Sequence, residues 1–410
     1  MEDVMTFIKT CLMLLVAAIS LGVVPVRKVA EPRPSPEFLK KSLSWLAESQ
    51  FENGGWGAGS HARQEIRDPR AVQIDPATTA FSAMALLRAG NTLKDGQYAR
   101  NVSKALSYLL DLVEASPDKG TNITTITGTQ PQAKMGQNID VTLCAQFFSR
   151  ILRHTSDDAK LKSRVTAALE KCLRKIERGQ NSDGSWAGGG WAGVLQSAMA
   201  NSALEAAQGT GAKVNEDALN RSREYQKSNV DAKTGEVKTE SSAGVSLYSI
   251  TSNQRATASE ARDAENSIDE AKRKGLLRGD ATVTKESLIG AGHSEKDAER
   301  LANAHKQNKT AQRMLNDESV MAGFGNNGGE EYLSYMMTAE SMVITKDSEY
   351  NNWYKNMSRR LEKIQEGNGS WTGHHCITSP VFCTAAVVMT LTADRDADVL
   401  VNEKQKKGIL

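Results

Sequence analysis

The sequence predicts an all-α fold, in which six helical hairpins form an α/α toroid: an inner ring of six helices within an outer ring, with a helical insertion. Two observations predict it. Amphipathic helical segments alternate along the chain with segments that are small and apolar on almost every side, and strand patterns are nearly absent. A helix that is apolar on every side must be enclosed by other helices.

The composition fits a single globular body built from repeats. The 410 residues contain 51 Lys and Arg against 49 Asp and Glu, so the net charge is only +2. This balance gives no basic field for nucleic acid, which we therefore exclude as a partner. Hydrophobic residues are 39% and charged residues 24%, values of a folded chain.

The amino terminus has the pattern of an export signal. Cys11 to Val24 is an uncharged apolar run of 14 residues, shorter than the roughly 20 residues of a membrane-spanning helix. We interpret residues 1–30 as a signal peptide, or alternatively as a membrane anchor, and 31–35 as a Pro-rich linker. The expected location is the periplasm, the cell envelope or the exterior, with membrane association through the N-terminus as the alternative.

The outer helices are the amphipathic, charged segments. The first begins after Ser35 with a proline at its first position and places Leu39, Leu43 and Leu46 on one face. The segments of this kind are 36–50, 97–114, 158–180, 213–228 and 347–366.

The inner helices are the segments of small and apolar residues, whose short side chains let enclosed helices approach one another closely. They are 76–89, 140–152, 193–208, 243–252, 331–344 and 380–393.

The predicted toroid covers 36–397, and 398–410 is a tail. Within it, 255–320 lacks aromatic residues and proline and is dense in Ala, Glu, Lys and Arg. Ser294 to Asp297 resembles a capping box that begins a helix. We expect an inserted helical subdomain here, either a solvated spacer or a surface that binds a protein partner.

Three turns share one pattern directly after an outer helix: QFENGGW at 50–56, QNSDGSW at 180–186 and QEGNGSW at 365–371. Asn or Asp before Gly permits a tight reversal, Gln can bond freed backbone groups, and Trp anchors the turn. The predicted role is structural. It falls on Gln50, Trp56, Gln180, Asp183, Gly184, Trp186, Gln365, Gly369 and Trp371.

This pattern resembles the QW repeat of the terpenoid cyclase and protein prenyltransferase toroid superfamily. With the inner helices, the resemblance covers about residues 36–393, and it is greatest to exported bacterial prenyltransferase and squalene oxidase repeat proteins. It implies the toroid fold more than a reaction.

The catalytic motifs that the resemblance implies are not matched. Squalene cyclases carry D-x-D-D, whereas the alternating Asp394, Asp396 and Asp398 lack the adjacent pair. Prenyltransferases hold zinc with Asp-x-Cys, whereas Asp140 and Cys144 are four apart, and Ser379 stands where the later His is expected.

The amino ends of parallel inner helices should meet at one rim, where helix dipoles favour anions. Candidate catalytic residues there are Asp140, Glu330, Glu331 and His375, and further rim residues are Asp75, Trp191, His374 and Cys376. The acids could instead cap helices. His375 and Cys376 could hold zinc, hydrogen-bond a ligand or serve structure, and a Cys376–Cys383 disulfide is another alternative.

Three functions remain open from the sequence, and whether the protein is an enzyme is uncertain. The first is a binding protein of the cell envelope that takes a small-molecule or lipid ligand, or a partner, at the central cavity. The second is a divergent enzyme on isoprenoid or lipid substrates that uses rim carboxylates or a metal. The third is a carbohydrate hydrolase or lyase with paired carboxylates.

Overall fold

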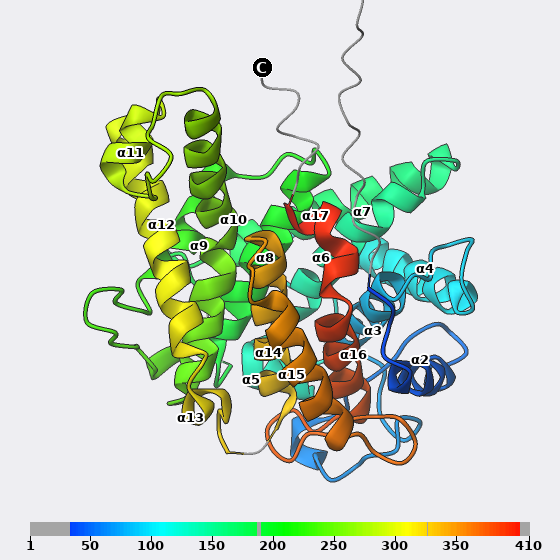
Figure 1. The fold of residues 1–410 in the computed structure, drawn as a ribbon. Coiled ribbons are helices and arrows are strands. Elements are labelled where there is room, and N and C mark those ends of the chain that lie inside the picture. The colour runs from blue at the N-terminus through cyan, green and yellow to red at the C-terminus, as the bar shows by residue number, and fades with distance from the viewer. Residues whose placement is uncertain (1–32, 187–189, 326, 402–410) are drawn as a thin grey trace, which may run out of the picture. The chain divides into compact units, whose positions relative to one another are not determined.

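Six helices pack side by side into a closed ring. The structure is a computed structural model that describes residues 33–186, 190–325 and 327–401, and nearly all of these belong to the unit that begins at Pro34. Each ring helix packs against the next, and the last packs back against the first (Figure 1). In ring order they are α3 (Pro76–Arg88), α6 (Ile139–Ile151), α8 (Gly193–Gly209), α10 (Ser246–Arg273), α14 (Gly329–Ile344) and α16 (Pro380–Leu391).

Six amphipathic helices pack on the outside of this ring. They are α2 (Phe38–Glu48), α4 (Ala99–Ala115), α7 (Ala159–Gly179), α9 (Glu216–Lys227), α12 (Glu295–Met314) and α15 (Tyr350–Lys363). Short elements fill the connections: α5 (Gln130–Met135), α11 (Lys285–Gly290), α13 (Glu318–Met321), α17 (Ala397–Val401), η1 (His61–Arg63), η2 (Leu152–His154), η3 (Glu240–Ser242) and η4 (Ala393–Asp396).

The prediction of an all-α toroid is confirmed. Every residue of α3, α6 and α16 is buried, as enclosure requires. Within the described ranges there is no strand, only two isolated bridges, Ser60–Thr129 and Val230–Val237. No helix in the described part is long and apolar enough to cross a membrane. The apolar run at 11–24 lies outside the described residues.

One helix boundary differs from the sequence interpretation. The fourth inner helix, expected to end at residue 252, continues unbroken as α10 to Arg273, so the expected start of the insertion at 255 lies inside it. Arg255 and Glu260 look solvated in the sequence but are buried and ion-paired. Beyond them α10, α11 and α12 enclose a small apolar cluster of their own, around Ile268, Leu288 and Leu301.

The three predicted turns form identical joints between helices. In each, the indole N–H of the Trp donates to a carbonyl of the outer helix before the turn: Trp56 to Leu46, Trp186 to Ile176 and Trp371 to Leu361, at 2.7–2.9 Å. The backbone N–H of each Trp donates to a hydroxyl of the next inner helix, namely Thr79, Ser197 and Thr384. All three indoles are fully buried.

The Gln of each joint reaches the following outer helix. Gln50 donates to the carbonyl of Asn101 in α4, Gln180 to that of Ala218 in α9, and Gln365 to that of Phe38 in α2. Each Gln side chain also bonds the glycine carbonyl of its own turn, as the sequence interpretation expected. The bond to the following outer helix was not expected. Gln365 therefore connects the last outer helix to the first.

The glycine of the joint is required by its surroundings. Gly184 has a φ of +90°, and a Cβ placed there would lie 2.2 Å from the carbonyl oxygen of Arg221 in α9. A larger residue would push the neighbouring outer helix away.

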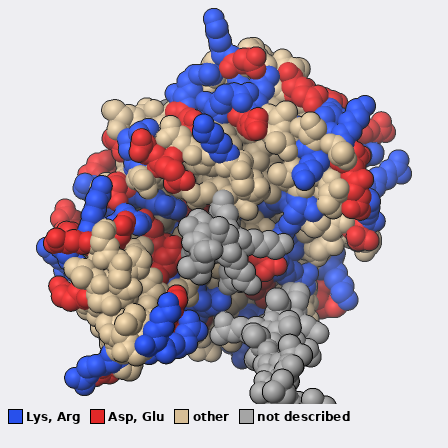
Figure 2. All heavy atoms as spheres, turned by 90° about the horizontal axis from the view of Figure 1, so that it is seen from above, with Lys and Arg blue, Asp and Glu red and all other residues tan. Residues whose placement is uncertain are grey.

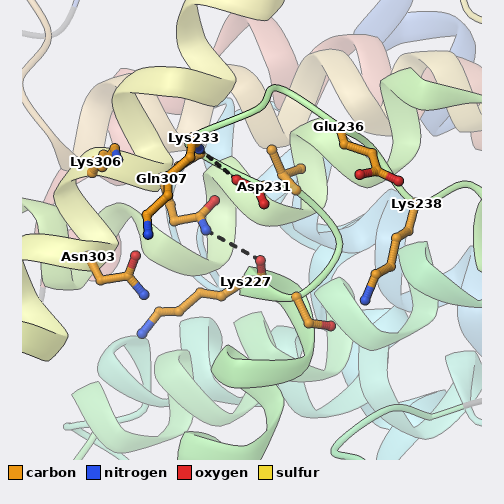
Figure 3. A pocket seen from close by; sticks show the side chains of 11 residues that line it. Lys227, Asp231, Lys233, Glu236, Lys238, Asn303, Lys306 and Gln307 are labelled. Carbon is orange, nitrogen blue, oxygen red and sulfur yellow. Dashed lines mark hydrogen bonds between the residues drawn. The ribbon is translucent and has the colours of Figure 1, made fainter.

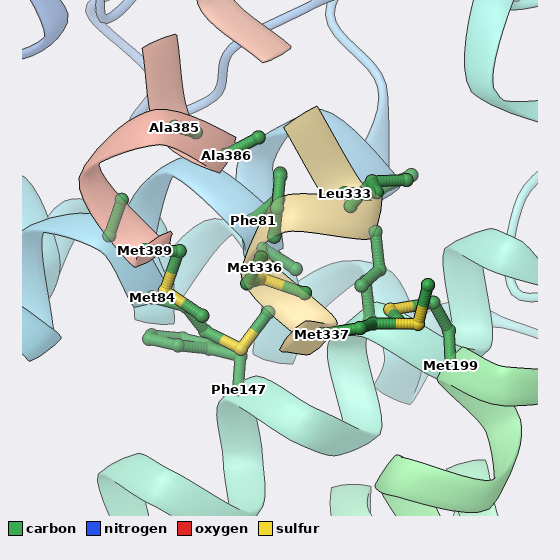
Figure 4. Packing of buried hydrophobic residues seen from close by; sticks show 14 of the residues in the cluster. Phe81, Met84, Phe147, Met199, Leu333, Met336, Met337, Ala385, Ala386 and Met389 are labelled. Carbon is green, nitrogen blue, oxygen red and sulfur yellow. The ribbon is translucent and has the colours of Figure 1, made fainter. Parts of the chain in front are cut away.

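The middle of the ring is filled by side chains (Figure 4). Phenylalanine, methionine, leucine and alanine side chains from the ring helices meet there. Their exposed fractions are 0–2%, so almost none of their surface is accessible to water. They include Phe81, Met84, Phe147, Met199, Leu333, Met336, Met337, Ala385, Ala386 and Met389. These side chains pack the region where the sequence analysis expected a central cavity. The flexible Met side chains among them suit this role, since they can fill irregular gaps.

A layer of six buried charges lies near the carboxyl ends of α3, α6, α8 and α14, with one member inside α10 and one in η4 after α16, and we call it the charge layer. Its side chains are only 1–7% exposed. Three are arginines and three are acids, so the charges sum to zero. The layer consists of Arg88, Arg150, Glu205, Arg255, Glu340 and Asp396.

Each member of the charge layer pairs across the ring. Arg88 lies 2.6 Å from Glu340 and 2.9 Å from Asp396. Arg150 bonds Asp396 at 2.8 Å, and Arg255 bonds Glu340 and Glu205, each at 2.9 Å. Three of the four other ring helices, α3, α6 and α10, are thus tied to α14 or to the segment after α16 through charge-assisted bonds, and α8 is tied to α10.

Two acids of the charge layer stay ionised under acidic conditions. Burial opposes ionisation, but the charges of Arg88, Arg255 and Arg150 outweigh it and lower the pKa of Glu340 to about 2. Arg88, Arg150 and Arg153 likewise lower the pKa of Asp396 to about 2. Because both folded pKa values lie below the ordinary ones, the layer stabilises the fold at neutral pH. This stabilisation is lost as the pH falls toward 2.

The face at the carboxyl ends of the ring helices carries both signs of charge. Figure 2 shows Lys and Arg interspersed with Asp and Glu there, in keeping with the totals of 51 and 49.

We predict that Trp186→Ala lowers the free energy of unfolding by about 3–5 kcal/mol, since it removes a buried indole and its hydrogen bond. Trp191→Ala is the matched control, because that indole is 65% exposed, and it should cost less than about 1 kcal/mol. Chemical denaturation of both variants measures the difference. Equal losses would contradict the assigned role of the joint.

We predict that Glu340→Gln lowers the free energy of unfolding by about 3–5 kcal/mol, because it leaves two buried arginines undercompensated. Glu295→Gln breaks an exposed pair with Lys285 and should change it by less than about 1 kcal/mol. Urea titrations at neutral pH compare them. A Glu340→Gln protein as stable as the control would show that the layer is dispensable.

Candidate functional site

The acids predicted at the rim lie at the amino ends of the ring helices, but they do not line an open cavity. Asp75, Asp140, Glu330 and Glu331 are each at most 1% exposed. No open polar cleft therefore runs between them, as sugar hydrolysis by paired carboxylates would need.

Asp75 and Asp140 both cap the amino end of α3. Asp75 accepts from the backbone N–H of Thr78 at 2.7 Å and from that of Ala58 at 2.8 Å. Asp140 starts in α6 but accepts from the N–H of Ala77 at 3.1 Å. Two carboxyl groups thus satisfy the free amides of one helix end.

The pKa values of these two acids are raised toward neutral pH. Burial raises the pKa of Asp75 to about 6, against the lowering effect of its hydrogen bonds. Burial, followed by the charge of Asp75, raises the pKa of Asp140 to about 7. Their hydrogen bonds make them structural groups first.

Glu330 and Glu331 bind the loops around the start of α14. Glu330 accepts from the N–H of Ile377 at 3.2 Å, and burial followed by the charge of Glu331 raises its pKa to about 8. Glu331 accepts from the N–H of Gly328 at 2.8 Å and from the hydroxyl of Tyr248 at 2.5 Å. Burial and then the charge of Glu331 raise the pKa of this Tyr248 hydroxyl.

The His-His-Cys segment is divided between surface and interior. His374 is exposed, and its backbone N–H bonds the carbonyl of Asn327. His375 turns inward, with Nε2 3.8 Å from Glu331 and its ring 5.1 Å from that of Phe324. Cys376 has a left-handed backbone with a φ of 59°.

The structure gives neither a metal cluster nor a disulfide at this segment. In the described ranges, no three His, Cys, Asp or Glu residues gather as metal ligands would. Around His375 and Cys376 the described residues form no group of three ligands of the kind that a zinc site uses. Cys144, Cys172, Cys376 and Cys383 are free thiols, so the Cys376–Cys383 bridge considered from the sequence is not formed.

Trp191 lies on the surface. Its ring is 65% exposed and carries the ammonium group of Lys134 at 4.2 Å from its centre. This cation–π contact fixes an aromatic residue at the rim and does not direct it into the ring.

A short helix that the sequence interpretation missed, α5, closes the rim. All of its residues except Ala133 are buried. Gln130 accepts from the N–H groups of Thr378 and Ser379 at 2.7 and 3.0 Å, which attaches α5 to the start of α16. A signal was present: Thr129 and Gln132 form a capping box around Pro131.

A groove of about 870 Å³ opens outside the ring, between α4 and the segment 116–125. Tyr108, Leu112, Ala115, Pro117 and Ile123 give it an apolar lining. Hydroxyl and amide groups stand around them, from Ser107, Ser116, Thr121, Asn122, Thr124, Thr125 and Asn53. Neither the turn motif nor the helix pattern pointed to this groove.

Basic side chains of α7 hold the segment that forms one wall of the groove. Lys171 donates to the carbonyl of Ser116, Lys175 to that of Pro117, and Arg178 to those of Asp118 and Gly120. The three donors recur on one face of α7. The backbone of the wall is therefore fixed before any ligand arrives.

We predict that Glu330→Gln reduces the pH dependence of stability. The folded pKa of about 8 lies above the ordinary 4.5, so wild-type stability falls as the pH rises from about 5 to 8. The slope from this residue approaches about 1.4 kcal/mol per pH unit. Urea titrations at pH 5, 7 and 9 measure it.

The uncharged glutamine should remove that slope, whereas Glu52→Gln, in an exposed turn, should retain it. Parallel curves for wild type and Glu330→Gln would contradict the assignment.

No protein-family model matches this chain, and no curated protein matches it. Among solved structures it is similar to the apo type II terpene cyclase MstE from Scytonema. The identity is 13%, the match covers 88% of this chain and 98% of that one, and the TM-score is 0.41. An alanine variant of that cyclase with its product merosterolic acid A gives 13% identity, coverage of 88% and 96%, and a TM-score of 0.33. The similarity concerns fold alone, and the toroid assignment here depends on the closed ring of helix contacts.

Proposed function

We propose that this protein binds a small apolar or amphipathic ligand and performs neither cyclase nor prenyl-transfer chemistry. The observation that carries the proposal is the groove between α4 and 116–125, which is open while the ring interior is filled. The proposed binding site is therefore on the outer wall of the toroid, and not at its centre, where the sequence analysis expected it.

Packing of the ring argues against carbocation chemistry. A cyclase must enclose its substrate and face the cation with aromatic rings. Here Met84, Met199, Met337 and Met389 occupy the middle of the ring and are at most 1% exposed. The acids at the amino ends of the ring helices, such as Asp75 and Asp140, accept hydrogen bonds from backbone amides, so they are poorly placed to protonate a substrate.

The groove has the properties of a ligand site. Its volume of about 870 Å³ lies within the roughly 300–1,000 Å³ of small-molecule pockets. Apolar side chains such as Leu112 and Ile123 would cover a hydrocarbon portion. The hydroxyl groups of Thr121 and Thr124 and the amide of Asn122 would meet a polar head.

We also propose that the protein is exported, on the support of the apolar run from Cys11 to Val24. An envelope protein that carries an apolar molecule would use such a groove to shield its ligand from water.

We expect Ala115→Trp to weaken binding of the neutral apolar fluorophore N-phenylnaphthylamine by about tenfold, because the indole would fill the groove. Ala115 is exposed at the end of α4, so the fold should tolerate the change. Ala159→Trp is the control, because this exposed alanine lies at the start of α7 outside the groove. Fluorescence titration gives both affinities.

Two results would overturn the proposal. The first is equal binding by wild type and Ala115→Trp. The second is a cyclised product when wild-type protein is incubated with squalene.

A further inference from the structure

A second hollow, which has a polar lining, lies between the segment 229–238 and helix α12. It encloses about 450 Å³ (Figure 3). Its walls carry four lysines: Lys227 at the end of α9, Lys233 and Lys238 on the 229–238 segment, and Lys306 on α12. We call it the lysine pocket.

The 229–238 wall of the pocket is a small, internally bonded hairpin. Val230 and Val237 form an antiparallel bridge. Asp231 accepts from the backbone N–H groups of Lys233 and Thr234 at 2.6 and 3.1 Å, and its own N–H donates to the backbone carbonyl of Glu236. The backbone that carries Lys233 and Lys238 is therefore fixed, although their side chains remain in water.

Only one of the four ammonium groups is neutralised by an ion pair. Lys227 is 4% exposed and lies 2.8 Å from Glu260 and 3.0 Å from Glu224. Within the described chain, no acid lies within ion-pair distance of Lys233, Lys238 or Lys306.

Two acids line the pocket, and one of them is already engaged. The pKa of Asp231 is lowered first by its bonds to the Lys233 and Thr234 amides, then by the charges of Lys233 and Lys306. Glu236 is the second acid, and three lysines thus outnumber two acids around the opening.

We propose that the lysine pocket binds a small molecule that carries a phosphate or diphosphate group. Lys233, Lys238 and Lys306 would neutralise its charge, and the Asn303 amide would donate to one of its oxygens. Phosphate groups suit such a site, because they offer several acceptor oxygens and more than one negative charge to lysines from separate segments. The volume admits a small molecule beyond the phosphate itself.

This inference is independent of the apolar groove, which no residue of the lysine pocket lines. Failure of either proposal leaves the other standing.

The test is calorimetric titration of the full chain with inorganic pyrophosphate at low ionic strength, where screening is weak. We expect the double variant Lys233→Gln and Lys306→Gln to bind about tenfold more weakly. Glu236→Gln should bind more tightly than wild type, because it removes an opposing charge at the opening.

Lys296→Gln is the matched control. It removes the same charge from an exposed position of the same helix, outside the pocket, and should leave the affinity within about twofold. Because all four positions are exposed, thermal unfolding should be unchanged in every variant.

Three outcomes would overturn the proposal. The first is no binding of pyrophosphate. The second is an equal loss in Lys296→Gln, which would indicate attraction by net charge alone. The third is binding to phosphatidate vesicles without binding of pyrophosphate, which would indicate a membrane-facing surface instead of a pocket.

Discussion

The closed ring depends on the charge layer, because its members are complete only together. Arg88 needs partners from α14 and from the end of α16, and Arg255 needs partners from α8 and α14. A ring with one helix displaced would leave a desolvated charge without compensation, which costs several kcal/mol. The layer therefore specifies the order of the helices in a way that alanine and methionine packing alone does not.

The joints and the charge layer divide this work between the two ends of the ring. The joints tie outer helices to inner ones near the amino ends of α3, α8 and α16. The other three connections lack the motif. They contain the groove wall with α5, the 229–238 hairpin, and α13. The groove and the lysine pocket thus both adjoin connections in which the repeated turn is absent.

Much of this fold could be predicted from the sequence, because enclosed and amphipathic helices have different compositions. The ranges 76–89 and 380–393 agree closely with α3 and α16, and the motif turns lie where their Gly and Trp residues require. The prediction was less successful where charged residues are buried. Arg255 and Glu260 resemble solvated surface in the sequence, since nothing local shows that each has a partner far along the chain.

The candidate site was predicted only in part, for a related physical reason. Helix direction correctly brought Asp75, Asp140, Glu330 and Glu331 to one end of the ring. Whether that end is open depends on how well side chains fill the centre and on α5, and a residue pattern does not report volume. A signal for the charge layer did exist: Arg88, Arg150, Glu205 and Glu340 each stand near the end of an otherwise apolar helix.

The bond from Gln365 to Phe38 makes the first and last parts of the toroid direct neighbours, and α2 also packs against α16. The packing of the helices therefore does not depend on where along the ring the chain begins and ends. A linker could join the start of α2 to the end of α17, and new termini could open in the exposed turn after α10. Such a circular permutant would keep every interhelical contact.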